Sequence, residues 1–495
     1  MKKFVKVIVS AVAAVSIIGV AAGVYFGYAK TTDETKTYTV ETNGNPLRVA
    51  VISDLQLPDS TDKTTHQYES FEKTLTMLKN KGMDALIIGG DFTDLSTKNA
   101  WGTYKEIYDR VMADSEKPIP LYIMGNHDYW LDYFTKSKEI ATPAKLQRRF
   151  TEYTGEYPYS HKIINGYHFI CWSSSNGSYD KSYTNKDWIR GELDQAVADD
   201  PNKPIFVITH LNPSDTAYGS DEWGNSDIAD VLKDYSQVIS ISGHSHYSVI
   251  DERSIWQDSF TAFTTQSLDY IELESGKFNG SIPKDAYGNT IAEQLPACLY
   301  MEIEEDKVTI SRLEANTGNT LKEPWVIEAP FGSEESLSKY TDNRMNTNQA
   351  PVLDRDLTVS VSDITDINGN QQKMISFAAG SDDDFVHSYK LEFQDENHNI
   401  LEFDEIDYDN HIVHYDENGD KISYDNENYN NGTPKKISQV LYFSDYVLGL
   451  NHMSETVELR LPATLPENTK YVVITAVDSW YAESEPMVCE LKQAE

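Results

Sequence analysis

The chain has 495 residues, with 42 lysines and arginines against 79 aspartates and glutamates, which gives a formal net charge of −37. This length indicates more than one domain, and the acidic excess argues against a nucleic-acid-binding surface, because nucleic acid is itself a polyanion. The three cysteines, Cys171, Cys298 and Cys489, lie far apart without a CxxC pair, which argues against a disulfide framework.

The N-terminus carries an apolar segment. An uncharged run occupies residues 7–29 and follows three lysines. A transmembrane helix needs roughly 20 apolar residues, so the run predicts a membrane anchor within residues 1–30. The lysines would stay on the cytoplasmic side and place the folded part outside the membrane. The alternative is a cleaved signal peptide, which would give a secreted protein. Polar residues 31–45 are typical of a spacer.

Strand and helix patterns alternate between residues 46 and 330, which predicts an α/β domain with helices outside the sheets. The apolar spacing of 68–81, 101–112, 142–153, 187–198 and 228–235 favours helices. An Asn165-Gly166 pair predicts a hairpin turn within 159–172. Short apolar runs predict strands at Leu47–Ser53, Asp84–Ile88, Ile119–Met124, Ile205–Thr209, Val238–Ser242, Phe260–Thr264, Cys298–Ile303 and Val308–Leu313.

Five polar clusters interrupt this pattern, and each comes directly after a predicted strand. Strand ends are where α/β folds place ligand groups. Asp, Asn, Gln and His side chains together are what a pair of metal ions would require. The clusters are Asp54-Leu55-Gln56, Gly90-Asp91-Phe92-Thr93-Asp94, Gly125-Asn126-His127-Asp128, Thr209-His210 and Gly243-His244-Ser245-His246.

The five clusters, in this order, resemble those of the calcineurin-like metallophosphoesterases, which carry D-x-H, G-D-x-x-D, G-N-H-D/E, a lone H and G-H-x-H. The resemblance covers residues 46–330. It implies a four-layer α/β/β/α sandwich and hydrolysis of phosphomonoesters or phosphodiesters by a hydroxide between two metal ions (Mn, Fe or Zn).

The resemblance also implies a role for each motif residue. Asp91 would bridge both metals, Asp54, Gln56 and His246 would hold the first, and Asn126, His210 and His244 would hold the second. His127 would stabilise the transition state or protonate the leaving oxygen. Asp128 would orient His127, and Asp94 would be a supporting residue. Asn126, His127 and Tyr129 would contact the substrate.

One position departs from the family pattern. Gln56 stands where the first motif usually ends in histidine. A neutral amide oxygen is a weaker ligand than imidazole for zinc or iron. The departure leaves open a different class of function, in which the domain is a degenerate metal-bound scaffold of a surface binding or adhesion protein.

The remainder predicts a linker and an all-β domain. Residues 331–350 are rich in Gly, Ser and Asn, which is typical of a linker. Short strand-like runs follow within 351–495, and the stretch Leu465–Tyr471 resembles a fibronectin type III domain. The resemblance implies an Ig-like sandwich in which Tyr471 is structural, with possible contact to the cell envelope or another protein. The acidic segment 416–420 predicts a hairpin turn rather than a calcium loop.

Overall fold

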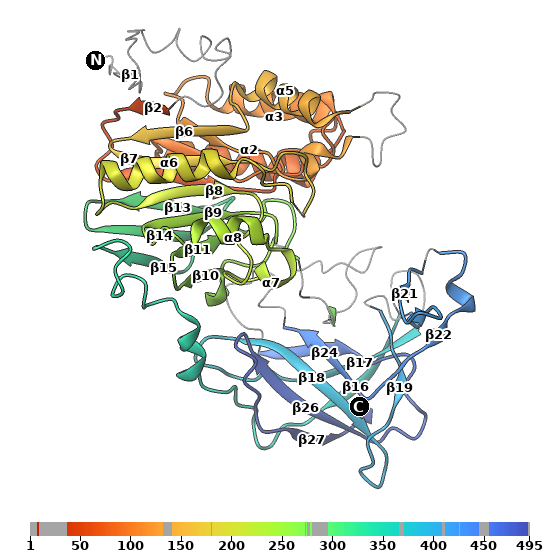
Figure 1. The fold of residues 1–495 in the computed structure, drawn as a ribbon. Helices are drawn as coiled ribbons and strands as arrows, with labels where there is room; N and C mark the ends of the chain where they lie inside the picture. Colours follow the sequence, from red (N-terminus) through yellow and green to blue (C-terminus); the bar gives the residue numbers. More distant parts are fainter. Residues whose placement is uncertain are drawn as a thin grey trace. The chain divides into compact units, whose positions relative to one another are not determined.

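The computed structural model describes residues 7–8, 37–131, 141–179, 181–272, 274, 278–279, 296–365, 371–407, 411–424, 426–444 and 455–493. The chain folds as two compact units (Figure 1). The first comprises Met1–Glu272 and Pro296–Asn343, and the second comprises Leu273–Leu295 and Arg344–Glu495.

Two β-sheets form the centre of the first unit. One follows the order β1-β2-β6-β7-β8-β9-β11-β10, with bounds Val7–Ile8, Thr37–Val40, Tyr159–Ile164, Tyr167–Trp172, Ile205–Thr209, Val238–Ser242, Thr261–Thr264 and Ile255–Gln257. The other follows the order β15-β14-β13-β3-β4-β5, with bounds Thr320–Glu328, Lys307–Glu314, Ala297–Ile303, Leu47–Ile52, Ala85–Ile88 and Ile119–Tyr122. Val49 and Ile87 of one sheet share a buried apolar core with Phe169 and Phe206 of the other, so the sheets pack face to face.

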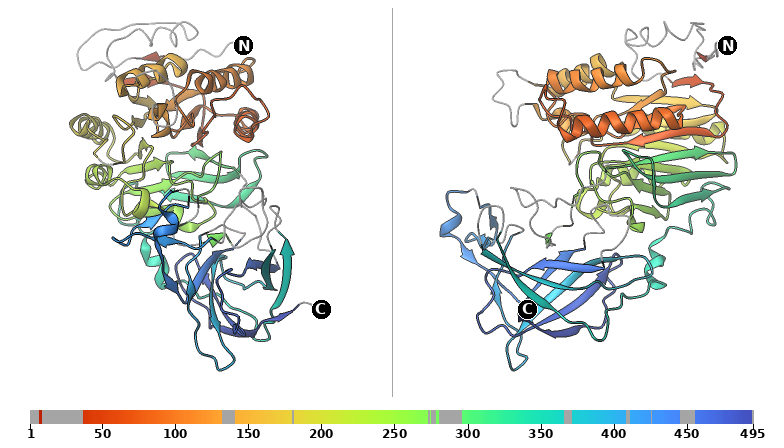
Figure 2. Two further views of the ribbon diagram at one scale, coloured as in Figure 1. Left: turned by 90° about the vertical axis from the view of Figure 1, so that its right-hand side faces the viewer. Right: turned by 180° about the vertical axis from the view of Figure 1, so that it is seen from behind.

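Helices cover both outer faces of this sandwich (Figure 2). The six-stranded sheet packs through Ile52 and Ile88 against apolar residues of α2 (His66–Lys81), α3 (Lys98–Val111) and α5 (Pro143–Thr154). The eight-stranded sheet packs against α6 (Lys186–Asp199) and α8 (Ser226–Leu232). The four-layer α/β/β/α arrangement expected for this region is therefore present. The short elements η1 (His127–Tyr129), α7 (Ser220–Trp223), η2 (Glu252–Ser254) and η3 (Asp342–Asn346) lie in the connections.

Local sequence explains where these elements begin and turn. The hydroxyl of Thr65 accepts the backbone N–H of Tyr68 and caps α2, and Gly82 ends that helix with φ +87°. The Asn165-Gly166 turn has positive φ at both residues, as a tight hairpin between β6 and β7 requires. The predicted hairpin is thereby confirmed.

The segment predicted as a linker differs from the expectation in its first part. Phe331 and Tyr340 are buried in the core of the first unit, and Tyr340 exchanges two hydrogen bonds with Gln257. Because these aromatic side chains pack into the core, residues 331–343 belong to the first unit rather than to a linker.

The predicted membrane span, residues 7–29, lies outside the described part of the chain except for its first two residues. Its two described residues, Val7–Ile8, pair with Val40 and Thr39 as strand rather than helix. Within the described residues, no helix combines the length and apolar character needed to cross a bilayer.

The second unit is all-β. Its larger sheet follows the order β12-β24-β18-β26-β27, with bounds Phe278–Asn279, Gln439–Phe443, Val386–Gln394, Tyr471–Asp478 and Met487–Glu490. A second sheet, β25-β17-β16-β28, comprises Thr456–Arg460, Gln371–Ala378, Ser360–Thr365 and Lys492–Gln493. Their inner faces share a core that includes Ile375, Tyr389 and Ile474.

Small strands occupy the connection between β18 and β24. They are β19 (Phe403–Asp404), β20 (His414–Tyr415), β21 (Lys421–Ile422), β22 (Thr433–Pro434) and β23 (Lys436–Ile437), with η4 at Tyr429–Asn431. Strands β20 and β21 pair antiparallel around the acidic segment, which confirms the predicted hairpin turn. The Tyr471 ring stacks on His398, with ring centroids 4.5 Å apart.

Candidate metal centre

The five polar clusters follow β3, β4, β5, β8 and β9. These strands run parallel within their sheets, so their carboxyl ends share one edge of the sandwich. The loops interlock through the backbone: the N–H of Asp54 donates to the carbonyl of Gly90, and the N–H of Gln56 donates to the carbonyl of Asp91. The structure thus brings together motif residues that lie up to 192 positions apart in the sequence.

Strained backbone is concentrated in these loops. Asp54, Gln56, Asp91, His244 and His246 all have positive φ, between 41° and 71°. This region is unfavourable for residues with a Cβ, and it persists only where surrounding structure enforces it. Every one of these residues was predicted as a metal ligand. The strain therefore indicates that the contacts between these loops, rather than local backbone preference, hold the five residues in this conformation.

Motif glycines allow the loops to approach closely. A Cβ on Gly125 would lie 2.6 Å from the backbone nitrogen of Asp91, and one on Gly243 would lie 2.7 Å from Oδ2 of Asp54. Both separations are shorter than real Cβ contacts. The glycines are thus needed for the fit between neighbouring loops.

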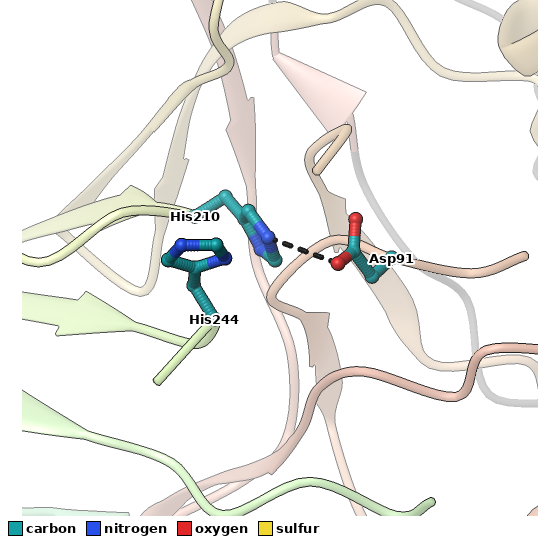
Figure 3. A group of neighbouring side chains, drawn as sticks. All are labelled: Asp91, His210 and His244. Atoms are coloured by element: carbon teal, nitrogen blue, oxygen red, sulfur yellow. Dashed lines mark ion pairs between the residues drawn. The ribbon is translucent and has the colours of Figure 1, made fainter. Parts of the chain in front are cut away.

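Asp91, His210 and His244 converge on one point (Figure 3). One ligand atom from each lies within 4.8 Å of the others. Nε2 of His210 is 3.2 Å from Oδ2 of Asp91 and 2.9 Å from Oδ1 of Asn126. Nδ1 of His210 is 2.8 Å from the carbonyl oxygen of Gly89, so Nδ1 carries the proton that donates to this carbonyl, and Nε2 faces the cluster.

A second group lies beside the first. Nε2 of His246 is 3.1 Å from Oδ1 of Asp54, and the other oxygen of Asp54 accepts the backbone N–H of His244. Gln56 is buried, and its Nε2 lies 3.4 Å from Nε2 of His127 and 3.5 Å from Nε2 of His246. All seven predicted metal ligands therefore meet at this edge of the sandwich.

The residues present fit metal ions. Buried polar atoms normally find hydrogen-bond partners, yet two potential ligand atoms of this cluster, Oδ2 of Asp91 and Nε2 of His244, have none among the described residues. Two carboxylates and three imidazoles also crowd a small buried volume, which is costly without compensating cations. Oxygen and imidazole nitrogen donors together suit Mn, Fe or Zn.

His127 is held by Asp94. Its Nδ1 lies 3.0 Å from the backbone carbonyl oxygen of Asp94 and 3.3 Å from Oδ1 of the same residue. Burial alone would lower the pKa of His127, but the charge of Asp91 and the contacts with Asp94 outweigh it and raise the pKa to about 9. The raised pKa favours the protonated form of His127, whose Nε2 faces Gln56 and Asp91.

The structure gives Asp128 a role that differs from the predicted one. Asp128 is fully buried and accepts hydrogen bonds from the backbone N–H groups of Phe92, Thr93 and Gly125 and from the Thr93 hydroxyl. Burial raises the pKa of Asp128 to about 7, and the charge of Asp91 adds to the effect. Asp128 thus joins the loop that follows β4 to the loop that follows β5. The residue that orients His127 is Asp94.

Tyr129 also differs from its predicted role in substrate binding. It is buried in an apolar core cluster, its hydroxyl donates to the carbonyl of Ser174, and it accepts a hydrogen bond from Gln147. Because its hydroxyl is engaged in these hydrogen bonds, Tyr129 stabilises the loop that follows β5 through buried contacts.

Other aromatic rings surround the site imidazoles. Trp130 packs on His127 with ring centroids 3.9 Å apart, Tyr270 packs on His246 at 4.3 Å, and Tyr179 packs on His244 at 5.2 Å. Tyr179 and Tyr270 are 40% and 38% exposed, so part of each ring remains available to a ligand. Tyr179 and Tyr270 were not predicted from sequence, because both stand outside the motifs.

Comparison with known proteins gives one family match, which covers the loops of this site. Residues 47–248 match the family model of the calcineurin-like phosphoesterases. All five clusters lie within these residues. A solved structure of a conserved uncharacterized protein, a predicted phosphoesterase from Streptococcus pneumoniae TIGR4, has 10% sequence identity and a TM-score of 0.23, covering 57% of this chain and 97% of that chain. No curated protein matches the sequence.

Proposed function

We propose that the first unit hydrolyses phosphate esters, phosphomonoesters or phosphodiesters, with two metal ions held between the five loops. The observation that carries the proposal is the convergence of Asp91, His210 and His244 beside Asp54 and His246. The calcineurin-like phosphoesterase match over the same loops supports it.

The donor atoms divide into two sets that share Asp91. One set is Asn126, His210 and His244, and the other is Asp54, His246 and Gln56. Bound there, two metal ions would neutralise phosphate oxygens and supply a hydroxide near neutral pH. The Asp91 carboxylate would offset the repulsion between two bound cations, so its removal is expected to abolish both positions.

His127 and Asn126 are the residues proposed to handle the substrate. His127 is 17% exposed, and Asp94 holds its Nδ1 side. Its Nε2–H is therefore free to donate to a phosphoryl or leaving-group oxygen. The unpartnered Nδ2 of Asn126 supplies a second donor. The described side-chain contacts of Asp54, Asp91, Asp94 and Asp128 include no lysine or arginine, so the site depends on metal charge to hold an anion.

We also propose an extracytoplasmic location, with residues 1–30 as a single-pass anchor, or a secreted protein if that segment is cleaved. The lysines before the apolar run support this topology. For the all-β second unit we propose an Ig-like or fibronectin type III accessory role in contact with the cell envelope or another protein.

The test uses the full chain purified in detergent. Metal is removed with a chelator, Mn²⁺, Zn²⁺ or Fe²⁺ is returned, and hydrolysis of p-nitrophenyl phosphate and bis-p-nitrophenyl phosphate is measured. Turnover should require metal and should disappear in Asp91→Ala. The exposed Asp114→Ala variant is the matched control and should retain activity. A chain that binds two metals without turnover would instead favour a non-catalytic surface binding protein, the alternative that Gln56 raises.

A further inference from the structure

We infer that the two metal positions differ in strength, so that one ion is resident and the other exchanges with the surroundings. The inference rests on the proposed function and deepens it, since hydrolysis would then depend on metal supply. We call the stronger the His210 position (Asp91, Asn126, His210, His244) and the weaker the His246 position (Asp54, Gln56, Asp91, His246).

The His210 position is prearranged. The Gly89 carbonyl fixes the tautomer of His210, and Nε2 of this ring already lies near the oxygens of Asn126 and Asp91. His244 adds a buried Nε2 with no hydrogen-bond partner among the described residues. Its backbone N–H donates to Asp54, which holds the loop. Little has to move before an ion binds, so affinity is not lost to reorganisation.

His246 lacks the support that His210 has. Its Nδ1 is buried and has no hydrogen-bond partner among the described residues. A proton on Nδ1 leaves a buried donor unsatisfied, whereas a proton on Nε2 removes the lone pair that would bind metal. Outer partners of metal-binding histidines typically contribute about 10–100-fold in affinity. The ring is instead packed against Tyr270, which orients it without stabilising either tautomer.

Gln56 is a second, independent reason for weak metal binding at the His246 position. Its amide nitrogen lies near the Nε2 atoms of both His127 and His246, and an amide nitrogen donates hydrogen bonds rather than binding cations. If the amide reverses to offer its oxygen, the ligand is neutral and harder than the imidazole expected there. Because both features act on one position, the difference should reach at least about tenfold.

Metal content at controlled free metal concentration tests this directly. The metal-stripped full chain is dialysed against buffered Zn²⁺ or Mn²⁺, and bound metal per chain is measured by mass spectrometry. Wild type should reach one ion per chain first, and the second should need at least about tenfold more free metal. His246→Ala should lose only the second ion, and His210→Ala should lose the first.

Gln56→His supplies the missing imidazole and should bring the second affinity toward the first. Gln371→His places an extra imidazole on an exposed strand of the second unit and should leave both affinities unchanged. If Gln56→His fails to fold, Gln56→Asn shortens the amide and should weaken only the second position.

Two ions that bind at free concentrations within threefold of one another would overturn the inference, and so would a Gln56→His variant with an unchanged second affinity. Neither result touches the proposed function, which fails separately if a chain with two bound ions hydrolyses no ester.

Discussion

Nδ1 of His127 lies 3.0 Å from the backbone carbonyl oxygen of Asp94, and the Asp94 carboxylate lies 3.3 Å from the same nitrogen. Asp94→Ala removes the carboxylate but keeps the carbonyl. We expect kcat to fall about tenfold, because a supporting partner of this kind contributes on that scale, with little change in KM. Steady-state kinetics of Asp94→Ala and wild type, together with an assay of bound metal, test this prediction. An unchanged kcat, or a loss of bound metal, would contradict the role of Asp94 in orienting His127.

Asp128 should behave differently, because it joins loops rather than orienting a reacting group. Asp128→Ala leaves the buried N–H groups of Phe92, Thr93 and Gly125 without their acceptor. Each unsatisfied buried donor costs about 1–3 kcal/mol, so we expect the free energy of unfolding to fall by at least about 2 kcal/mol. Urea unfolding measures it. A variant with normal stability but lost turnover would restore the predicted catalytic role.

Gly125→Ala should weaken metal binding by displacing the backbone of Asp91. The new Cβ would press on the backbone of Asp91, whose carboxylate is proposed to serve both metal positions. We expect bound metal to fall below one ion per chain. Gly102→Ala is the matched control, because nothing lies within 4 Å of its Cβ on α3, and it should raise stability by about 0.5–1 kcal/mol. Normal metal content in Gly125→Ala would contradict this prediction, because it would show that the loop can shift to accommodate the Cβ.

His168 should make the protein less stable in mild acid. It is buried, and its Nδ1 lies 2.8 Å from Nε2 of His161, while Asp199 lies 3.5 Å from its other nitrogen. Burial, together with the charge of His161, lowers the pKa of His168 from 6.5 to about 4.

The unfolded chain therefore binds more protons between these values, so stability decreases as pH falls from about 6.5 toward 4. At pH 5 the contribution is about 1–2 kcal/mol. Urea unfolding of wild type and His168→Gln at pH 7 and pH 5 should show a smaller loss in the variant. Equal losses would assign the acid sensitivity to other groups.

The exposed rings of Tyr179 and Tyr270 predict a preference for esters that carry a planar group. Stacking on an aromatic side chain contributes about 1–3 kcal/mol by alanine substitution. Tyr179→Ala or Tyr270→Ala should therefore weaken inhibition by phenylphosphonate about tenfold, with little effect on methylphosphonate. Tyr235→Ala is the control, because it precedes the amino end of β9, opposite the site. Equal weakening for both phosphonates would argue against stacking.

Sequence patterns predicted the first unit well, because its helices and central strands have clear periodicity. The strand β15 was not predicted, since Pro324 interrupts its pattern, and proline is tolerated there only because β15 lies at a sheet edge. The packing of Phe331 and Tyr340 was also missed. Two aromatic residues within a Gly- and Ser-rich segment give no periodic signal.

The seven predicted metal ligands lie close together because the clusters that carry them follow strands whose carboxyl ends share one edge of the sandwich. The roles of Asp94 and Asp128 were exchanged for a physical reason. Asp128 is the immediate neighbour of His127, yet η1 directs it toward the Phe92–Thr93 backbone, while a separate loop brings Asp94 to the imidazole. Sequence proximity does not report such directions. Tyr179 and Tyr270 were missed because only the folded loops place them beside His244 and His246.

The central claim is tested most directly by the rate of hydrolysis of p-nitrophenyl phosphate and bis-p-nitrophenyl phosphate, measured against bound metal per chain. We expect little turnover with one ion and a steep rise as the second binds, with no turnover in Asp91→Ala at any metal concentration. A folded wild-type chain that holds two ions and hydrolyses neither ester would contradict the account.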